Sequence, residues 1–260
     1  MKIALISLSR QGARVAHVLA AHLAESEVYL HRRVGEAPGT RRFDHVADLA
    51  RGLFARCRGL VFIGPAGIAV RAVAPLLGDK RTDPAVVVVD VGGRWAVSLL
   101  GGHEGGANEL ATAVSNILSA EPVITTTTEA AKTIIVGIGC RRGTPAEAIL
   151  GAVGQALAAA GATLQQVRLL ASADVKRREA GLLEASRRLG IPLRLISSEE
   201  IRSSRRDFGR SDFVRRKVDL PAVAEPAALL AGRRTRLLLP KQKFGSVTVA
   251  LAAENCTWSE

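Results

Sequence analysis

Two nearly continuous apolar runs constrain the possible folds more than any other feature of the sequence. AVVVVDV (residues 85–91) and TIIVGIG (residues 133–139) hold apolar side chains at successive positions rather than at every second one. A strand that is apolar on both faces is typical of a parallel sheet with helices packed on each side. The sequence therefore predicts an α/β fold.

Predicted strands and helices alternate around both runs. The helices are recognised by apolar residues three and four positions apart, and Gly92-Gly93 indicates a tight hairpin turn between two strands. In the first half, strands are expected at residues 2–8, 28–31, 59–63, 85–91 and 95–100, and helices at 12–24, 46–56, 68–77 and 108–118. In the second half, strands are expected at 133–139, 167–172, 192–197, 235–240 and 246–252, and helices from 145 onward, at 181–190 and at 226–232.

A threonine-rich stretch without periodicity, residues 122–132, separates two such series. We expect two α/β domains, residues 1–128 and 129–260, each a largely parallel or mixed sheet flanked by helices. The length of 260 residues is enough for two domains with cores of their own.

Composition narrows the class of protein. Hydrophobic residues make up 48%, yet no apolar run reaches the roughly 20 residues that span a bilayer, so we expect no membrane partner. The three cysteines, Cys57, Cys140 and Cys256, are far apart and odd in number. They suggest a reducing cytoplasm without a disulfide framework.

The formal net charge of +12 has two explanations that the sequence does not separate. It suits an anionic partner, including a small substrate with many carboxylates, and it equally suits an arginine-rich surface without a specific role. The basic residues are spread out, with one denser stretch at residues 202–217. Aromatic residues make up 3% and nucleic-acid-binding motifs are absent, so we expect no nucleic-acid partner.

Glycine-rich turns between a strand and a helix occur three times, at residues 64–67, 101–106 and 137–143. Free N–H groups at a helix N-terminus bind carboxylate or phosphate, and glycines let such a ligand come close to the backbone. In open α/β sheets these loops lie at the carboxyl ends of strands. Ordinary turn chemistry is the competing explanation for each loop. The candidate ligand-binding residues of these loops are Gly64, Gly67, Gly101, Gly102, Gly105, Gly106, Asn108, Gly139, Cys140 and Thr144.

His103 stands out because glycines surround it and cannot bury it. A histidine on such a loop titrates near neutral pH and can act as a general base. Asp90 and Glu109 are candidates for orienting it, and a purely loop-shaping role is the alternative.

Several basic residues follow predicted strands of the second half. We expect Arg141, Arg142 and Lys176, together with Lys241 and Lys243 in a loop after residue 240, to hold substrate carboxylates; for any one of them, solvated surface charge is the competing explanation. Thr144, Pro145 and Glu147 fit the N-cap, N1 and N3 positions of a capping box.

Several long motifs together resemble one family. VVVVDVGGRWAVSLLGGHEGGANELA (86–111), with TDP (82–84) and GPAGIAVRAVAP (64–75) upstream, resembles the N-terminal region of the cobalt-precorrin-5A hydrolase (CbiG) family of anaerobic cobalamin biosynthesis. VGIGCRRGTPAEAI (136–149), residues 173–193 and LLLPKQKFGSVTVALA (237–252) resemble the family's C-terminal domain.

The resemblance implies a hydrolase that opens the δ-lactone of cobalt-precorrin-5A and releases acetaldehyde, which gives cobalt-precorrin-5B. The implied partner is a cobalt-bearing tetrapyrrole with many carboxylates, and neighbouring pathway enzymes are further expected partners. No cofactor and no protein metal site are expected, since the substrate carries the cobalt. The alternative function is that of a non-catalytic protein that holds a corrin intermediate. This alternative is retained because the family's extra middle segment after the ITT motif is missing here.

Overall fold

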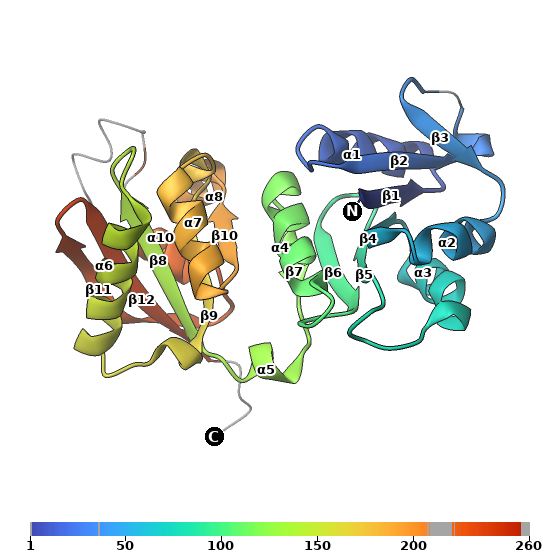
Figure 1. Ribbon diagram of the computed structural model, residues 1–260. Coiled ribbons are helices and arrows are strands. Elements are labelled where there is room, and N and C mark those ends of the chain that lie inside the picture. Colours follow the sequence, from blue (N-terminus) through green and yellow to red (C-terminus); the bar gives the residue numbers. More distant parts are fainter. Residues whose placement is uncertain (1, 36, 207, 209–219, 221, 256–260) are drawn as a thin grey trace. The chain divides into compact units, whose positions relative to one another are not determined.

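The computed structural model describes residues 2–35, 37–206, 208, 220 and 222–255, and the chain divides into two compact units, residues 1–126 and 127–260 (Figure 1). Each unit is a sheet flanked by helices, which confirms the predicted α/β class. The division falls inside the threonine-rich stretch.

The first unit is built on a seven-stranded sheet in the order β3-β2-β1-β4-β5-β6-β7. Strands β1 to β5 are parallel, β6 is antiparallel to β5, and β7 is parallel to β6. The strands are β1 (Lys2–Ser7), β2 (Ser26–His31), β3 (Thr40–Phe43), β4 (Cys57–Ile63), β5 (Ala85–Val89), β6 (Trp95–Leu100) and β7 (Glu121–Val123). The helices are α1 (Arg10–Ala20), α2 (Val46–Phe54), α3 (Ala66–Val73) and α4 (Ala107–Leu118).

Two apolar layers fill this unit, one on each face of its sheet. Helices α1 and α4 pack on one face and α2 and α3 on the other. Strand β5 contributes to both layers: Val87 and Val89 face α1 and α4, and Val86 and Val88 face α2 and α3. This two-sided burial is the physical reason for the continuous apolar run.

The second unit contains a five-stranded sheet in the order β10-β9-β8-β12-β11. Strands β8, β9 and β10 are parallel, and β12 lies antiparallel between β8 and β11. The strands are β8 (Ile134–Cys140), β9 (Val167–Ala173), β10 (Leu193–Ile196), β11 (Thr235–Phe244) and β12 (Val247–Glu254). The helices are α5 (Thr127–Ala130), α6 (Ala146–Ala159), α7 (Ala180–Leu189), α8 (Ser198–Ser203) and α10 (Ala224–Leu230).

Helices α6 and α7 cover one face of this sheet, and α8 and α10 cover the other. Helix α10 lies unusually close to β8, because a Cβ atom on Gly137 would come within 2.0 Å of the Ala224 carbonyl oxygen and 2.7 Å of the Ala228 nitrogen. Gly137 is therefore required by backbone-to-backbone packing.

Several sequence expectations need correction. Strands β3 and β7 and helix α8 were not expected, because short or half-exposed segments carry little periodicity. The capping box is wrong: Pro145 is the N-cap residue of α6, and the Thr144 hydroxyl instead donates to the Arg141 carbonyl oxygen at 2.8 Å. Lys241 and Lys243 lie within β11 rather than in a loop, because pairing with β12 continues to Phe244. Most of the basic stretch at 202–217, and Cys256, lie outside the described residues.

The close approach of α10 to β8 gives a stability prediction. Gly137→Ala should destabilise the protein by about 1–3 kcal/mol, because the added methyl group meets backbone that cannot rotate away. Gly151→Ala is the control: this position in α6 has open space around it, so the substitution should be stabilising by about 0.5–1 kcal/mol. Denaturant unfolding of both variants measures the difference, and equal effects would contradict the packing.

Candidate functional site

The glycine loop that carries His103 lies at the amino edge of the parallel strands, not at their carboxyl edge. Strand β6 runs antiparallel to β5, so Leu100 at its end pairs with Val86 near the beginning of β5. The loop packs there, since a Cβ on Gly101 would lie 3.3 Å from the Pro84 carbonyl oxygen. This placement corrects the expectation that all such loops share the carboxyl edge.

The glycines of this loop serve its own folding. Gly101 and Gly106 have φ values of +73° and +81°, which glycine adopts without strain. The carbonyl oxygens of Gly101 and Gly102 accept hydrogen bonds from the N–H groups of Ala107 and Asn108, each at 3.0 Å. These two N–H groups at the start of α4 are therefore used inside the protein rather than offered to an anion.

The tip of the loop remains available. His103 is exposed, and in the part of the chain that the structure describes its ring has no hydrogen-bond partner. The N–H groups of residues 103–106 likewise have no acceptor among the described residues. Glu104 forms an exposed ion pair with Lys80 at 3.0 Å. Glu109 lies exposed in the first turn of α4. An imidazole beside open N–H donors is an arrangement that can take a proton and stabilise an oxyanion.

Asp90 lies at the opposite edge of the sheet from His103. It follows the last residue of the five-residue strand β5, so at about 3.3 Å per residue it lies roughly 16 Å from the beginning of that strand. Its carboxylate accepts hydrogen bonds from the N–H groups of Gly92, Arg94 and Trp95, at 3.1, 2.7 and 2.9 Å. Burial alone would raise the pKa of Asp90, but these bonds hold it below its ordinary value. Asp90 therefore caps the hairpin turn.

Gly64 and Gly67 are also remote from the histidine loop. They lie where β4 leads into α3, at the carboxyl edge, and the Gly64 N–H donates to the Val89 carbonyl oxygen at 2.9 Å. The sequence thus indicated two glycine loops in the first unit, residues 64–67 and 101–106. In the structure they lie at opposite edges of the sheet, one strand length apart.

In the second unit, the predicted residues do gather at one edge. Gly139 and Cys140 end β8, Arg141 and Arg142 follow, and the β11–β12 turn lies alongside, with Val247 paired to Cys140. The guanidinium groups of Arg141 and Arg142 are exposed and have no hydrogen-bond or ion-pair partner within the described part of the chain, although the charge of Arg142 also acts on the Glu179 carboxylate. They are positioned to bind a carboxylate from solvent.

The loop bearing these arginines is held from two sides. The Arg141 N–H donates to the Ser246 carbonyl oxygen at 3.1 Å, and the Gly143 N–H donates to the Glu179 carboxylate at 3.1 Å. Thr144, 6% exposed, lies beneath the loop. Neither Glu179 nor Ser246 was expected from the sequence, because their role arises from contacts between segments distant along the chain.

Lys176 differs from the arginines, because its ammonium group is already paired with Glu179 at 3.2 Å and both side chains are largely buried. Burial alone would raise the pKa of Glu179, but the Gly143 N–H and Lys176 hold it below its usual range. Burial raises the pKa of the neighbouring Cys140 thiol. Lys243 is exposed on the edge strand β11, and the Lys241 N–H donates to the buried Glu225 carboxylate at 2.9 Å.

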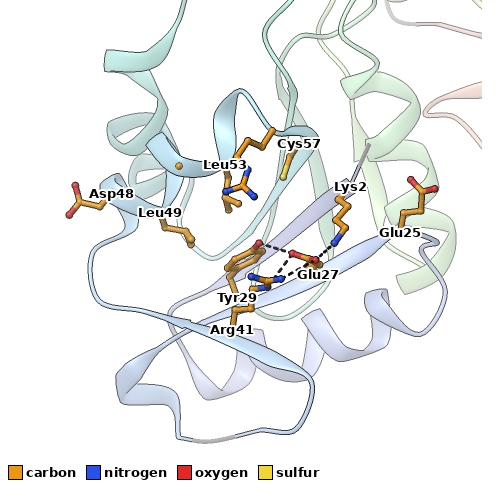
Figure 2. A pocket seen from close by; sticks show the side chains of 11 residues that line it. Lys2, Glu25, Glu27, Tyr29, Arg41, Asp48, Leu49, Leu53 and Cys57 are labelled. Carbon is orange, nitrogen blue, oxygen red and sulfur yellow. Dashed lines mark hydrogen bonds and ion pairs between the residues drawn. The ribbon is translucent and has the colours of Figure 1, made fainter.

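A separate pocket of about 790 Å³ lies between α2 and the beginnings of β1, β2 and β4 (Figure 2). Its centre is Glu27, whose carboxylate contacts Lys2, accepts a hydrogen bond from the Tyr29 hydroxyl at 2.8 Å and pairs with Arg41 at 3.3 Å. These groups satisfy one another across three strands, so the pocket's main cluster is a structural network rather than an open set of ligands.

This network gives a pH prediction, since Tyr29 is the single tyrosine of the chain. Burial and the bond to Glu27 raise its pKa to about 12, against about 10 in an unfolded chain. The stabilisation is fully present below about pH 10 and is lost as the pH rises towards 12. Tyrosinate absorbance should titrate near pH 12 in the folded protein, and Glu27→Gln should lower the midpoint. Asp48→Asn, at the pocket rim, should not move it; a wild-type midpoint near 10 would contradict the network.

The described residues contain no group of three or more histidine, cysteine or acidic side chains arranged to hold a metal ion. None of their helices is long and apolar enough to cross a membrane.

Comparison with known proteins finds two family models in chain order. The model described as "Cobalamin synthesis G N-terminal" matches residues 48–129, and "Cobalamin synthesis G C-terminus" matches residues 134–252.

Curated relatives agree with these models. A cobalt-precorrin-5A hydrolase of Priestia megaterium is 26% identical, covering 96% of this chain and 94% of the relative. One of Salmonella typhimurium (strain LT2) is 28% identical, covering 96% of this chain and 97% of the relative. Protein CobE of a Sinorhizobium species is 34% identical, covering 48% of this chain and 83% of that protein. With both family models matched in sequence order and these relatives beside them, the chain belongs to the CbiG, or cobalamin synthesis G, family.

Proposed function

We propose that this chain is a cobalt-precorrin-5A hydrolase, which opens the δ-lactone of its substrate and releases acetaldehyde to give cobalt-precorrin-5B. The observation that carries the proposal is the alignment of 96% of the chain with two relatives named for this activity. The substrate is a cobalt-bearing tetrapyrrole with many carboxylates. The protein supplies no cofactor of its own in this proposal, because the cobalt arrives with the substrate. Enzymes that make this substrate or use its product are proposed as transient partners.

His103 is proposed as the general base. Its exposed ring removes a proton from water as the water oxygen attacks the lactone carbonyl carbon. The carbonyl oxygen then becomes an oxyanion, and the unengaged N–H groups of residues 103–106 are proposed as its donors. Collapse of this intermediate breaks the ring C–O bond and gives a carboxyl group, which ionises to a carboxylate, and an alkoxide. The alkoxide becomes the carbonyl group of acetaldehyde as its carbon–carbon bond to the macrocycle breaks, and the macrocycle keeps the electron pair of that bond and takes up the proton from His103. Glu109, in the first turn of α4, remains the candidate for orienting the loop, whereas Asp90 is engaged at the opposite sheet edge.

Arg141 and Arg142 are proposed to hold substrate carboxylates. Both guanidinium groups are exposed on a loop whose backbone is fixed by Glu179 and Ser246. A planar guanidinium binds a carboxylate through two parallel hydrogen bonds. Lys243 offers a further cation on the neighbouring edge strand, while Lys176 is committed to Glu179.

A non-catalytic protein that binds a corrin intermediate is the second candidate. It is favoured by the alignment with the Priestia megaterium relative, which extends over 352 positions although this chain has 260 residues, so positions of that relative have no counterpart here. Purified protein mixed with excess cobalt-precorrin-5A separates the two: a hydrolase releases acetaldehyde over many turnovers, whereas a binding protein retains the macrocycle unchanged.

Substitution of His103 tests its assignment as the base. His103→Ala should lower kcat by at least about 100-fold, because a positioned base contributes at least that much, and His103→Asn should be nearly as inactive because an amide is not basic. Acetaldehyde release measures the rate, and macrocycle absorbance measures binding, which should persist. His45→Ala is the control. His45 is an exposed histidine at the N-cap position of α2, and its side chain makes no capping hydrogen bond. Near wild-type turnover of either His103 variant would assign the loop a purely structural role.

Substitution of Arg141 tests carboxylate binding. Arg141→Ala should raise KM by about two- to tenfold with a smaller change in kcat, as expected for an exposed ion pair. Arg141→Lys should restore only part of the affinity, since lysine cannot bind a carboxylate in the same two-point geometry. Arg236→Ala, an exposed arginine near the other end of β11, should leave KM unchanged. An unaltered KM for Arg141→Ala would remove this residue from the site.

A further inference from the structure

Asn108 combines two properties that do not suit direct contact with a substrate. The residue is only 6% exposed, and both polar groups of its amide are engaged within the protein. Its Oδ1 atom accepts a hydrogen bond from the Ser98 hydroxyl at 2.8 Å, and its Nδ2 atom donates to the Thr126 hydroxyl at 3.1 Å. Asn108 therefore has little left to offer a ligand, contrary to the sequence expectation.

The same residue links three segments that are separate along the chain. Ser98 belongs to β6, Thr126 follows β7, and the backbone N–H of Asn108 donates to the Gly102 carbonyl oxygen at 3.0 Å. Gly102 immediately precedes His103. A single residue thus joins the strand before the loop and the segment after β7 through its side chain, and the loop itself through its backbone N–H.

Packing around Gly102 makes this link rigid. A Cβ atom at this position would come 2.5 Å from the Thr126 Cγ2 atom and 3.3 Å from the Asn108 Oδ1 atom. The backbone of Gly102 therefore packs against two of the three members of the polar network, Thr126 and Asn108. Because a buried amide that loses a partner is destabilised, the network has one favourable arrangement, and that arrangement fixes the backbone on one side of His103.

We propose that Asn108, with Ser98 and Thr126, is a positioning residue that holds the His103 loop in its reactive geometry. The proposal rests on the proposed function, in which His103 is the base. It adds that the loop must be held in one conformation, which the glycines of the loop do not achieve by themselves. The glycines permit the close backbone packing, whereas the amide network selects one loop conformation.

Removal of single hydrogen bonds tests this role. Thr126→Val keeps the side-chain shape but cannot accept the Nδ2 bond, and Asn108→Asp replaces the donating Nδ2 group with an oxygen. Both should lower kcat by about 10- to 100-fold, the effect of a misplacement of about 1 Å, and change KM by less than about threefold. Thr126→Ser, which retains the hydroxyl, should restore most of the activity. Hydrogen exchange of the segment 101–108 should accelerate in Thr126→Val and Asn108→Asp and not in Thr126→Ser.

Thr112→Val is the matched control. Thr112 is a buried threonine of α4, the helix that carries Asn108, and is 3% exposed; its hydroxyl donates to the Asn108 carbonyl oxygen at 2.9 Å and not to the side-chain amide. The Thr112→Val variant should lose thermal stability but should not show the fall in kcat expected for Thr126→Val and Asn108→Asp. Equal kcat values for Thr126→Val and Thr112→Val, or a KM effect alone for Asn108→Asp, would overturn the positioning role. If wild-type protein releases no acetaldehyde, the hydrolase proposal fails, and unchanged exchange of 101–108 in Thr126→Val would separately refute the network.

Discussion

The reversal of chain direction between β5 and β6 is the constraint on which the arrangement of the first unit depends. The Asp90 carboxylate accepts three N–H groups within the turn and stabilises a tight hairpin through Gly92-Gly93. Because β6 then runs back along β5, the loop that follows it emerges at the amino edge. A crossover to a parallel strand would have brought His103 to the same edge as Gly64 and Gly67. One capped turn therefore decides which residues can belong to one site.

Beneath the histidine loop, the chain uses polar groups where a core ordinarily uses apolar ones. Asn108, Thr112 and Ser115 are all buried in α4, and each has a hydrogen-bond partner. An apolar contact tolerates sliding, whereas a hydrogen bond is directional and holds one geometry. Directional contacts favour one conformation of the loop that they support, while the apolar layers of the same unit provide most of its stability.

In the second unit, charge is divided between fixed and available groups. Lys176 and Glu179 are largely buried and bind each other, and the second oxygen of Glu179 also fixes the Gly143 backbone. Arg141 and Arg142 remain exposed on the loop so held. Since a buried pair is costly to break and an exposed guanidinium is free to exchange partners, the first pair supports the loop and the two arginines stay accessible to solvent.

The sequence by itself determined the α/β class, the two series of strands and helices, and the family, because apolar periodicity and long motifs are local properties of the chain. It also singled out His103, whose glycine neighbours leave it exposed. Only the tertiary structure decided that Asp90 lies at the opposite edge of the sheet from this histidine, that Asn108 is buried, and that Glu179 and Ser246 support the arginine loop. The physical reason is that strand direction and burial follow from pairing between distant segments, which residue types and their spacing do not encode.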